Sequence, residues 1–292
     1  MANKIIQEIK LEKTIDELLE FSIANIDKPA GPTSFTVDII IKQALDLKKS
    51  SHFGTLDPGV TGVLPVSLNR ACRLMPYFIN KKKTYIGIMR LHRDISEELL
   101  RREIKNFIGQ ITQLPPVKSR VKRQERQREV YSFEILEING KDILFKSEVE
   151  AGTYIRKLVY DIGEKIGGAN MLELRRIQAG IFEEKESHTI FEFLEAIEKC
   201  EKGDEKSLRE MLIPAEIILE VLEVIQVKKE FIEKLYHGSP LFKTHTGKSI
   251  KKFNVDDKIA VFCKNKFIGV FSVVQDEQIL AKPEFVLQPI VK

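Results

Sequence analysis

The residue of this sequence best placed for chemistry is Asp57, which lies in the run HFGTLDPG at residues 52–59. A single aspartate in a loop is usually a turn former or a helix cap. Here it lies between Gly54 and Gly59 and is followed by Pro58, a setting that fixes the backbone and lets another chain approach closely. Such a carboxylate can act as a nucleophile or a base if it is ionised and has a cationic partner.

A second group of residues could bind phosphates. Residues 118–128, KSRVKRQERQR, hold six basic side chains against one acid. Clustered arginines suit bidentate phosphate contacts, so a role in nucleic-acid binding is favoured over a merely solvated face. The acidic run at residues 183–210 is interpreted as a solvated face. The basic side chains are Arg120, Lys122, Arg123, Arg126 and Arg128, together with Lys118.

Hydrophobic spacing and turn residues predict the elements that position these groups. Asn139-Gly140 between two alternating runs is the strongest short hairpin signal, and it places the basic run in a loop before the hairpin. The candidate residues therefore lie where loops meet strands and helices. Strands are predicted at 21–27, 84–91, 130–138 and 142–150, and helices at about 33–45, at 96–108 and around 155–162.

Composition narrows the class of protein. The 292 residues are 43% hydrophobic and 31% charged with a net charge of +4, which is typical of a globular protein and not of a disordered chain. No run is long and apolar enough to cross a bilayer, and charges near the N-terminus argue against export, so a cytoplasmic protein is expected. The three cysteines are far apart, and the histidines show no metal-ligand spacing.

The chain is predicted to divide into two domains and an extension. Pro214 marks a boundary, and short β-rich runs separated by turns follow from about Val221. We expect a catalytic domain at residues 23–215 and a small β domain at residues 221–292. Residues 1–22 form an N-terminal extension that could pack on the small domain.

Several segments together carry a resemblance to a known family. In their order and separation they resemble the TruB/dyskerin family of RNA pseudouridine synthases, over about residues 23–182. The segments are NIDKPAGPTSF at 25–35, HFGTLDPGVTGVLPV at 52–66, KTYIGIMRLH at 83–92, GTYIRKL at 152–158 and LRR at 174–176.

The resemblance implies an α+β fold, with a catalytic domain built on a mixed, largely antiparallel sheet and a small β-rich PUA RNA-binding domain. It also implies an isomerisation in which the glycosidic bond of uridine is broken, the uracil is rotated and a carbon–carbon bond is made to the same ribose. This reaction imports no group and changes no oxidation state, so neither a cofactor nor a metal is expected.

The resemblance also implies residue roles. Asp57 would be the catalytic nucleophile or base and Arg156 its cation, while Tyr85 would stack on the uracil. Tyr154 would be a second aromatic of the pocket and Leu174 an apolar contact on the flipped base. Without the family match, both tyrosines would be interpreted as core residues, and a core role for Leu174 is nearly as strong an alternative.

Other matching positions concern RNA and the loop. His52 matches a histidine that helps to hold RNA, and the basic run from Arg120 to Arg128 resembles a mobile thumb that closes on RNA. Lys28 and Pro29 match a motif that buttresses the active-site loop. Ser51 and Phe53 depart from the family pattern, and a bulky ring at 53 is expected to alter the approach of RNA.

Two branches of the family are considered. The run RLHRDI at 90–95 and the segment from Leu114 onward resemble the archaeal H/ACA ribonucleoprotein subunit. That branch implies guide RNA and small H/ACA core proteins as partners and rRNA or tRNA as substrate. The alternatives are a stand-alone enzyme for the TΨC-loop uridine of tRNA and an inactive RNA-binding scaffold. The scaffold is disfavoured because binding alone needs no carboxylate beside RNA phosphates.

Overall fold

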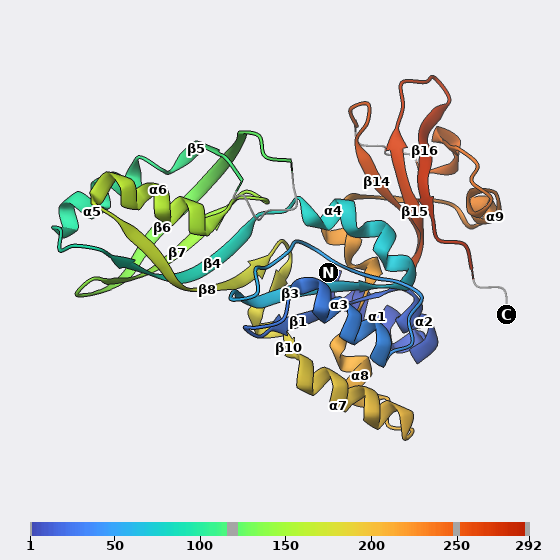
Figure 1. Cartoon of the computed structure of the whole chain (residues 1–292). Coiled ribbons are helices and arrows are strands. Elements are labelled where there is room, and N and C mark those ends of the chain that lie inside the picture. The colour runs from blue at the N-terminus through green and yellow to red at the C-terminus, as the bar shows by residue number, and fades with distance from the viewer. Residues whose placement is uncertain (1, 116–121, 248–251, 290–292) are drawn as a thin grey trace.

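The computed structural model describes residues 2–115, 122–247 and 252–289. Over these residues the chain folds into two mixed β-sheets with helices around them, so the predicted α+β class is confirmed (Figure 1). The larger sheet follows the order β10-β1-β3-β8-β4-β7-β6-β5, and the smaller one the order β12-β14-β15-β16-β13. Most pairs are antiparallel, whereas β1–β10, β3–β8 and β12–β14 are parallel.

The larger sheet also contains β2 and β11, which pair with β3 and β1, and β9, which pairs with β8. Its strands, in chain order, are β1 (Ser22–Lys28), β2 (Ser50–His52), β3 (Thr61–Leu68), β4 (Lys83–Leu91), β5 (Gly109–Gln113), β6 (Arg126–Asn139), β7 (Asp142–Val149), β8 (Ala169–Ala179), β9 (Phe182–Glu183), β10 (His188–Thr189) and β11 (Leu212–Pro214). The smaller sheet is made of β12 (Glu223–Gln226), β13 (Leu241–Phe242), β14 (Lys258–Cys263), β15 (Lys266–Val273) and β16 (Ile279–Val286).

The helices occupy the two ends of the larger sheet and the edge of the smaller one (Figure 1). None of the described helices is long and apolar enough to cross a membrane. The α-helices are α1 (Ala2–Glu12), α2 (Ile15–Glu20), α3 (Ser34–Ala44), α4 (Met75–Ile79), α5 (Glu97–Lys105), α6 (Ile155–Ile166), α7 (Ile190–Glu201), α8 (Lys206–Met211) and α9 (Ile232–Tyr236), and short 3₁₀ turns include η1 (Asn69–Leu74) and η3 (Ala215–Glu220).

Local signals explain where several elements begin. Thr33 and Ser96 cap α3 and α5, each accepting a hydrogen bond from a backbone N–H of the first turn. The predicted hairpin is present as β6 and β7, with Gly140 in the left-handed conformation at φ 57°. However, β6 begins at Arg126, so Arg126 and Arg128 lie on a strand paired with β5. The prediction that they lie in a loop was wrong.

One close approach positions the centre of the larger sheet. At Gly62 of β3, a Cβ atom would lie 2.1 Å from the carbonyl oxygen of Arg176 on β8, and φ is +100°. Only glycine fits both restrictions. The parallel pairing of Gly62 with Arg176 therefore brings β8 against the start of β3, where the loop carrying Asp57 ends.

Phe53 packs into an aromatic core between the two sheets. Its ring is 1% exposed, stacks on Phe78 with ring centroids 5.0 Å apart, and contacts Phe182 at 5.8 Å. The same cluster includes Phe262 and Phe267 of the smaller sheet. The expectation that this ring alters the approach of RNA is not supported, because the side chain faces the interior.

The N-terminal helices pack mainly on the segment that links the two sheets. α1 and α2 contact β11, α1 also contacts η3, and Lys13 forms an ion pair of 2.6 Å with Glu216. Contacts also reach the smaller sheet: Asn265 donates a hydrogen bond of 3.4 Å to Glu8, and the ring of Phe21, just after α2, stacks on Phe267 of β15 with ring centroids 5.6 Å apart. The domain boundaries at residues 23, 215 and 221 stay a prediction.

Candidate active site

Asp57 lies on a loop between β2 and β3 whose backbone is held from several sides. The Ser34 hydroxyl, at the start of α3, accepts a hydrogen bond of 2.8 Å from the Leu56 N–H and donates one of 3.1 Å to the Leu56 carbonyl. The Pro58 carbonyl accepts from Lys28 Nζ at 3.1 Å and from the Gly31 N–H at 2.9 Å. These contacts fix the residues on both sides of Asp57.

Lys28 is fully buried at the end of β1, and its ammonium group also donates to the Pro29 carbonyl at 2.7 Å. Burial lowers the pKa of Lys28, and the nearby Asp57 carboxylate raises it. Two backbone carbonyls and one carboxylate thus offset the cost of burying this charge. The geometry is that of a buttress, as the sequence motif at Lys28 and Pro29 predicts.

The Asp57 carboxylate points outward and faces a cation. Its Oδ2 lies 3.2 Å from Nη1 of Arg156, in the first turn of α6. The side chains are 53% and 59% exposed, so the pair is accessible from solvent and weak on its own. A rigid loop thus presents a carboxylate with a cation beside it, at a surface where a flipped nucleotide could enter.

Arg176 is a functional residue that sequence reasoning missed, although it lies in the LRR segment. It is 1% exposed, and its Nε and Nη2 donate to the carbonyls of Val63 and Gly54 at 2.8 and 2.9 Å. Burial lowers the pKa of Arg176, and the nearby Tyr85 raises it. Arg176 therefore holds the Asp57 loop against β3 and lies beside the ring predicted to stack on uracil.

Tyr85 and Leu174 lie on the neighbouring strands β4 and β8 and are both 8% exposed. They belong to the hydrophobic core of the larger sheet, together with Ile155 of α6. Tyr154 precedes α6, and its backbone N–H and carbonyl both bond the side-chain amide of Gln113, at 3.0 and 3.2 Å. The amide of Gln113 therefore fixes the start of the helix that carries Arg156.

His52 is tied to neighbouring residues of this chain. Its Nδ1 lies 2.6 Å from Asp38 Oδ2 on α3, and its Nε2 lies 3.1 Å from the Thr55 hydroxyl on the Asp57 loop. The ring is partly buried and bridges the helix to the loop. This geometry describes a structural contact, and the RNA-binding role of His52 stays a prediction.

The basic run is only partly described, since Arg120 lies outside the described residues. Lys122 and Arg123 are exposed, whereas Arg126 and Arg128 on β6 are half-buried. Arg128 Nη1 lies 3.5 Å from Glu150. The Nε atoms of Arg126 and Arg128 are buried without a hydrogen-bond partner, so a phosphate would have to meet the outer nitrogens of these side chains.

Lys83 is a third buried basic residue near the Asp57 loop, after Lys28 and Arg176. It is 4% exposed, and its ammonium group donates to the carbonyls of Ile79 and Lys81 at 3.0 and 2.6 Å. Burial, with a smaller contribution from Arg176, lowers the pKa of Lys83 to about 7. Within the described ranges, no group of three or more His, Cys, Asp or Glu side chains could hold a metal ion.

Comparisons with known proteins identify similar sequences and structures over most of the chain. Residues 42–99 match the TruB family pseudouridylate synthase N-terminal domain, and residues 156–220 match the tRNA pseudouridylate synthase B C-terminal domain. The chain is 42% identical over 252 residues to "Probable tRNA pseudouridine synthase B" of Methanocaldococcus jannaschii, covering 86% of this chain and 75% of the relative. A relative of the same name from Pyrococcus horikoshii is 43% identical, with 85% and 74% covered.

Two solved structures are similar over nearly the whole chain. "Crystal Structure of a Cbf5-Nop10-Gar1 Complex" is matched with a TM-score of 0.87 and 36% identity, covering 96% of this chain and 89% of that one. "Structure of H/ACA RNP bound to a substrate RNA containing 2'-deoxyuridine" is matched with a TM-score of 0.86, 34% identity and the same coverage. With relatives this similar over most of its length, the chain belongs to the TruB family of pseudouridylate synthases, which are isomerases that act on RNA.

Proposed function

We propose that this chain converts specific uridines of RNA to pseudouridine as the guide-RNA-dependent catalytic subunit of an H/ACA ribonucleoprotein. The observation that carries the proposal is Asp57: its loop is held by backbone contacts at Gly54, Leu56 and Pro58, while its carboxylate is 53% exposed and forms an ion pair with Arg156. Fixing a reactive group in one geometry before the substrate arrives is a main source of catalytic rate.

In this proposal Asp57 acts on a uridine that has left its stack. The bond between N1 of uracil and C1′ of ribose breaks, the uracil rotates, and C5 bonds to C1′ while its proton is lost. Asp57 serves as the nucleophile or base, and Arg156 is the cation that faces its negative charge beside the nucleotide. Flipping costs a few kcal/mol, which stacking and phosphate contacts must offset.

The remaining predicted residues are assigned to RNA binding. Tyr85 stacks on the uracil, Tyr154 and Leu174 complete the wall, and His52 lies beside the loop that receives the nucleotide. The basic side chains Lys122, Arg123, Arg126 and Arg128, with Arg120, bind phosphates. Support comes from their placement: Tyr85 and Leu174 lie on neighbouring strands, and Leu174 and Arg156 line the same cavity.

The guide-dependent assignment rests on similarity to structures whose titles name Cbf5, Nop10, Gar1 and a substrate RNA. The proposed partners are therefore guide RNA, small core proteins and rRNA, in the cytoplasm of an archaeal cell. Residues 221–292, which form the smaller sheet, are proposed to be a PUA domain that binds the guide RNA.

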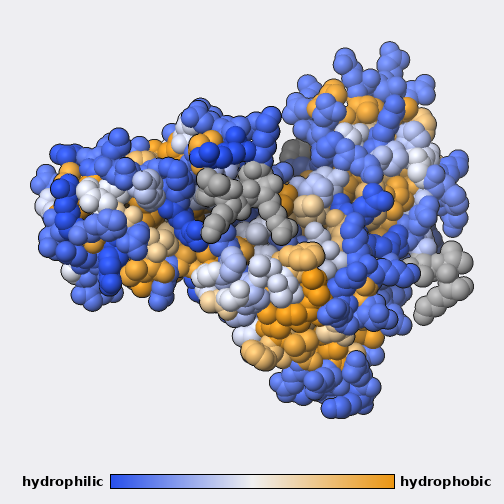
Figure 2. All heavy atoms as spheres, in the orientation of Figure 1, coloured by the Kyte–Doolittle hydropathy of each residue, from blue (hydrophilic) through white to orange (hydrophobic). Residues whose placement is uncertain are grey.

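An exposed apolar surface offers a place for a core protein. Phe35 and Ile39 of α3 are 58% and 36% exposed, and Phe191 of α7 is 82% exposed. The two helices contact each other, and Figure 2 shows an apolar area at the lower centre of this face. Apolar patches of this kind commonly mark protein contacts.

A stand-alone tRNA enzyme is the second candidate, because the curated relatives are named tRNA pseudouridine synthase B. One experiment separates the readings: an unmodified tRNA transcript and an rRNA fragment are incubated with the protein alone, and then with guide RNA and small core proteins. We expect pseudouridine in the rRNA only in the complete mixture. Product in tRNA with the protein alone would favour the stand-alone enzyme, and no product in any mixture would favour an inactive scaffold.

A further inference from the structure

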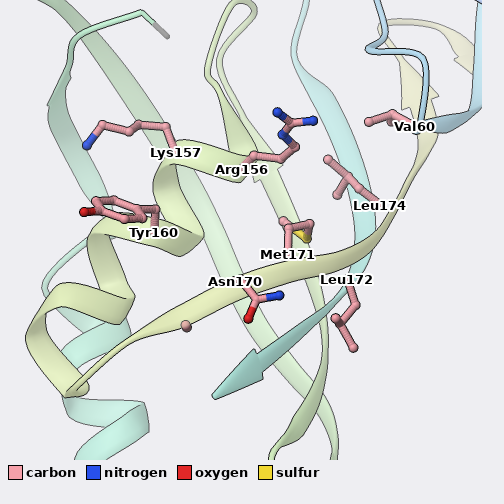
Figure 3. Close-up of a pocket in the computed structure, with 10 residues that line it drawn as sticks. Val60, Arg156, Lys157, Tyr160, Asn170, Met171, Leu172 and Leu174 are labelled. Carbon is pink, nitrogen blue, oxygen red and sulfur yellow. The ribbon is translucent and has the colours of Figure 1, made fainter. Parts of the chain in front are cut away.

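A cavity of about 410 Å³ lies beside the Asp57–Arg156 pair, and apart from Arg156 and Leu174 the residues that line it have no role in the proposed uridine site (Figure 3). Its size falls in the range of about 300–1,000 Å³ that is usual for ligand pockets. Three segments line it: the residues that follow Asp57-Pro58, one side of α6, and the first half of β8. The lining residues are Gly59, Val60, Arg156, Lys157, Tyr160, Ala169, Asn170, Met171, Leu172 and Leu174.

The cavity is continuous with the candidate active site but distinct from it. Arg156 belongs to both, because its guanidinium pairs with Asp57 while its side chain lines the cavity. Leu174 is likewise shared, whereas Tyr85 and Tyr154 do not line the cavity. A nucleotide in this cavity would therefore be the neighbour, along the RNA, of the nucleotide at Asp57.

The cavity combines a stacking ring with positive charge. Tyr160 is 52% exposed on α6, and the ammonium group of Lys157 lies 5.3 Å from the centre of its ring. Lys157 also pairs with Asp161, which is not among the lining residues. The lining contains two cations, Arg156 and Lys157, and no acid. Aromatic rings beside cations are the usual surface on which proteins stack unpaired bases of RNA.

Asn170 supplies an oriented polar group. Its Oδ1 lies 3.1 Å from Nε2 of His92, a contact that directs the carbonyl of the amide toward the histidine. Among the described residues, the side chain of Asn170 bonds another side chain through Oδ1 alone, and Figure 3 shows it on β8 next to Met171. An amide donor held in this way can bond an acceptor on a base edge.

We infer that this cavity binds the base of one nucleotide next to the target uridine, stacked on Tyr160 and contacted by Asn170, with its phosphate near Lys157. The inference rests on the proposed function, because it takes the RNA substrate from there. It adds to the site a second contact that reads the RNA beside the modified position.

The test combines a protein variant with an RNA variant. Substrate RNAs are made with an abasic residue on the 5′ side or on the 3′ side of the target uridine. The dissociation constant and the turnover rate of each RNA are measured for the wild-type chain and for Tyr160→Ala, in the assembly that gives product. The matched control is Tyr131→Ala, a tyrosine on β6 that is 43% exposed and does not line the cavity.

We expect Tyr160→Ala to raise the dissociation constant of intact RNA by about fivefold or more. One of the two abasic RNAs should bind the wild-type chain as weakly as intact RNA binds Tyr160→Ala. The Tyr160→Ala change should then not weaken the binding of that abasic RNA any further. Asn170→Ala should likewise have no effect with that RNA, and Tyr131→Ala should match wild type throughout.

The inference is overturned if intact RNA binds Tyr160→Ala as tightly as it binds the wild-type chain. It is also overturned if, for both abasic RNAs, Tyr160→Ala raises the dissociation constant by the same factor as it does for intact RNA. A Tyr160→Ala defect only in the binding of small core proteins would also overturn it, since the cavity would then dock a protein. If wild type binds RNA but forms no pseudouridine in any assembly, the proposed function fails, while the binding comparison still tests the cavity.

Discussion

The guanidinium of Arg176 on β8 donates a hydrogen bond of 2.9 Å to the carbonyl oxygen of Gly54, three residues before Asp57. Lysine at this position keeps the charge but has no planar fork to contact the carbonyls of Gly54 and Val63 together. We expect Arg176→Lys to lower kcat by about 10²-fold, because small displacements of a reactive group are that costly. The dissociation constant for RNA should change little. Steady-state kinetics and equilibrium binding test this, and a change confined to RNA affinity would contradict it.

Replacing Asp57 by asparagine tests the nucleophile directly. Asp57→Asn should lower turnover by at least about 10⁴-fold, the upper end of what a positioned base contributes, because the amide is a poor nucleophile and base. RNA binding should stay near the wild-type value. Asp46→Asn makes the same change at an exposed turn residue and serves as the control. Turnover that survives in Asp57→Asn would remove this residue from the mechanism.

Removing two exposed cations tests the basic run. Lys122→Gln with Arg123→Gln should weaken RNA binding and flatten its salt dependence by about 0.7–0.9 in the logarithmic slope for each RNA phosphate that the variant no longer neutralises. Lys199→Gln with Lys202→Gln, in and after α7, removes the same charge elsewhere and should leave the slope unchanged. Binding is measured by fluorescence anisotropy over a salt series, and equal slopes for both double variants would refute phosphate binding by Lys122 and Arg123.

Lys83 predicts a pH dependence of stability. Its pKa is about 7 in the fold and near its ordinary 10.5 in the unfolded chain. Between these values the unfolded chain binds more protons, so this residue makes the free energy of unfolding rise with pH, by up to about 1.4 kcal/mol per pH unit. Lys83→Met removes that contribution. Urea denaturation at pH 7, 8 and 9 compares the two proteins, and parallel pH profiles would show that Lys83 titrates normally.

Phe53 should matter for stability and not for RNA. Phe53→Ala should lower the free energy of unfolding by about 3–5 kcal/mol, because the ring fills a core shared by both sheets. The milder Phe53→Leu should keep the RNA dissociation constant of wild type. Denaturation and binding measurements check the two statements, and tighter or weaker RNA binding by Phe53→Leu would revive a role in RNA approach.

Local signals predicted much of the fold. The caps at Thr33 and Ser96 and the turn at Gly140 depend on neighbouring residues, so they can be found in sequence. The pairing of β3 with β8 joins residues more than 100 positions apart, so no pattern among neighbouring residues predicts it. For the same reason, the start of β6 at Arg126 was missed, since its first residues pair with β5 across the basic run.

Some residues of the candidate site could likewise be predicted from local motifs, and others could not. Asp57, Arg156 and Tyr85 lie in recognisable motifs, and the structure brings Asp57 to Arg156 as expected. Arg176 lies in a motif too, but its type alone suggests an exposed cation, and only the fold shows it buried against Gly54. Asn170 and Tyr160 carry no sequence signal, because their interest comes from a cavity formed by α6 and β8 together.

The order of the strands has a consequence for synthesis of the chain on the ribosome. β1 is made early, yet its partners β10 and β11 follow more than 150 residues later. Likewise, the hydrogen bond that holds Gly54 in the Asp57 loop can form only after Arg176 has been synthesised. A nascent chain shorter than about 176 residues therefore has the contacts of the Asp57 loop to Ser34, Lys28 and Gly31 but lacks the one that Arg176 makes to Gly54, so the loop is held on all sides only once β8 has left the ribosome.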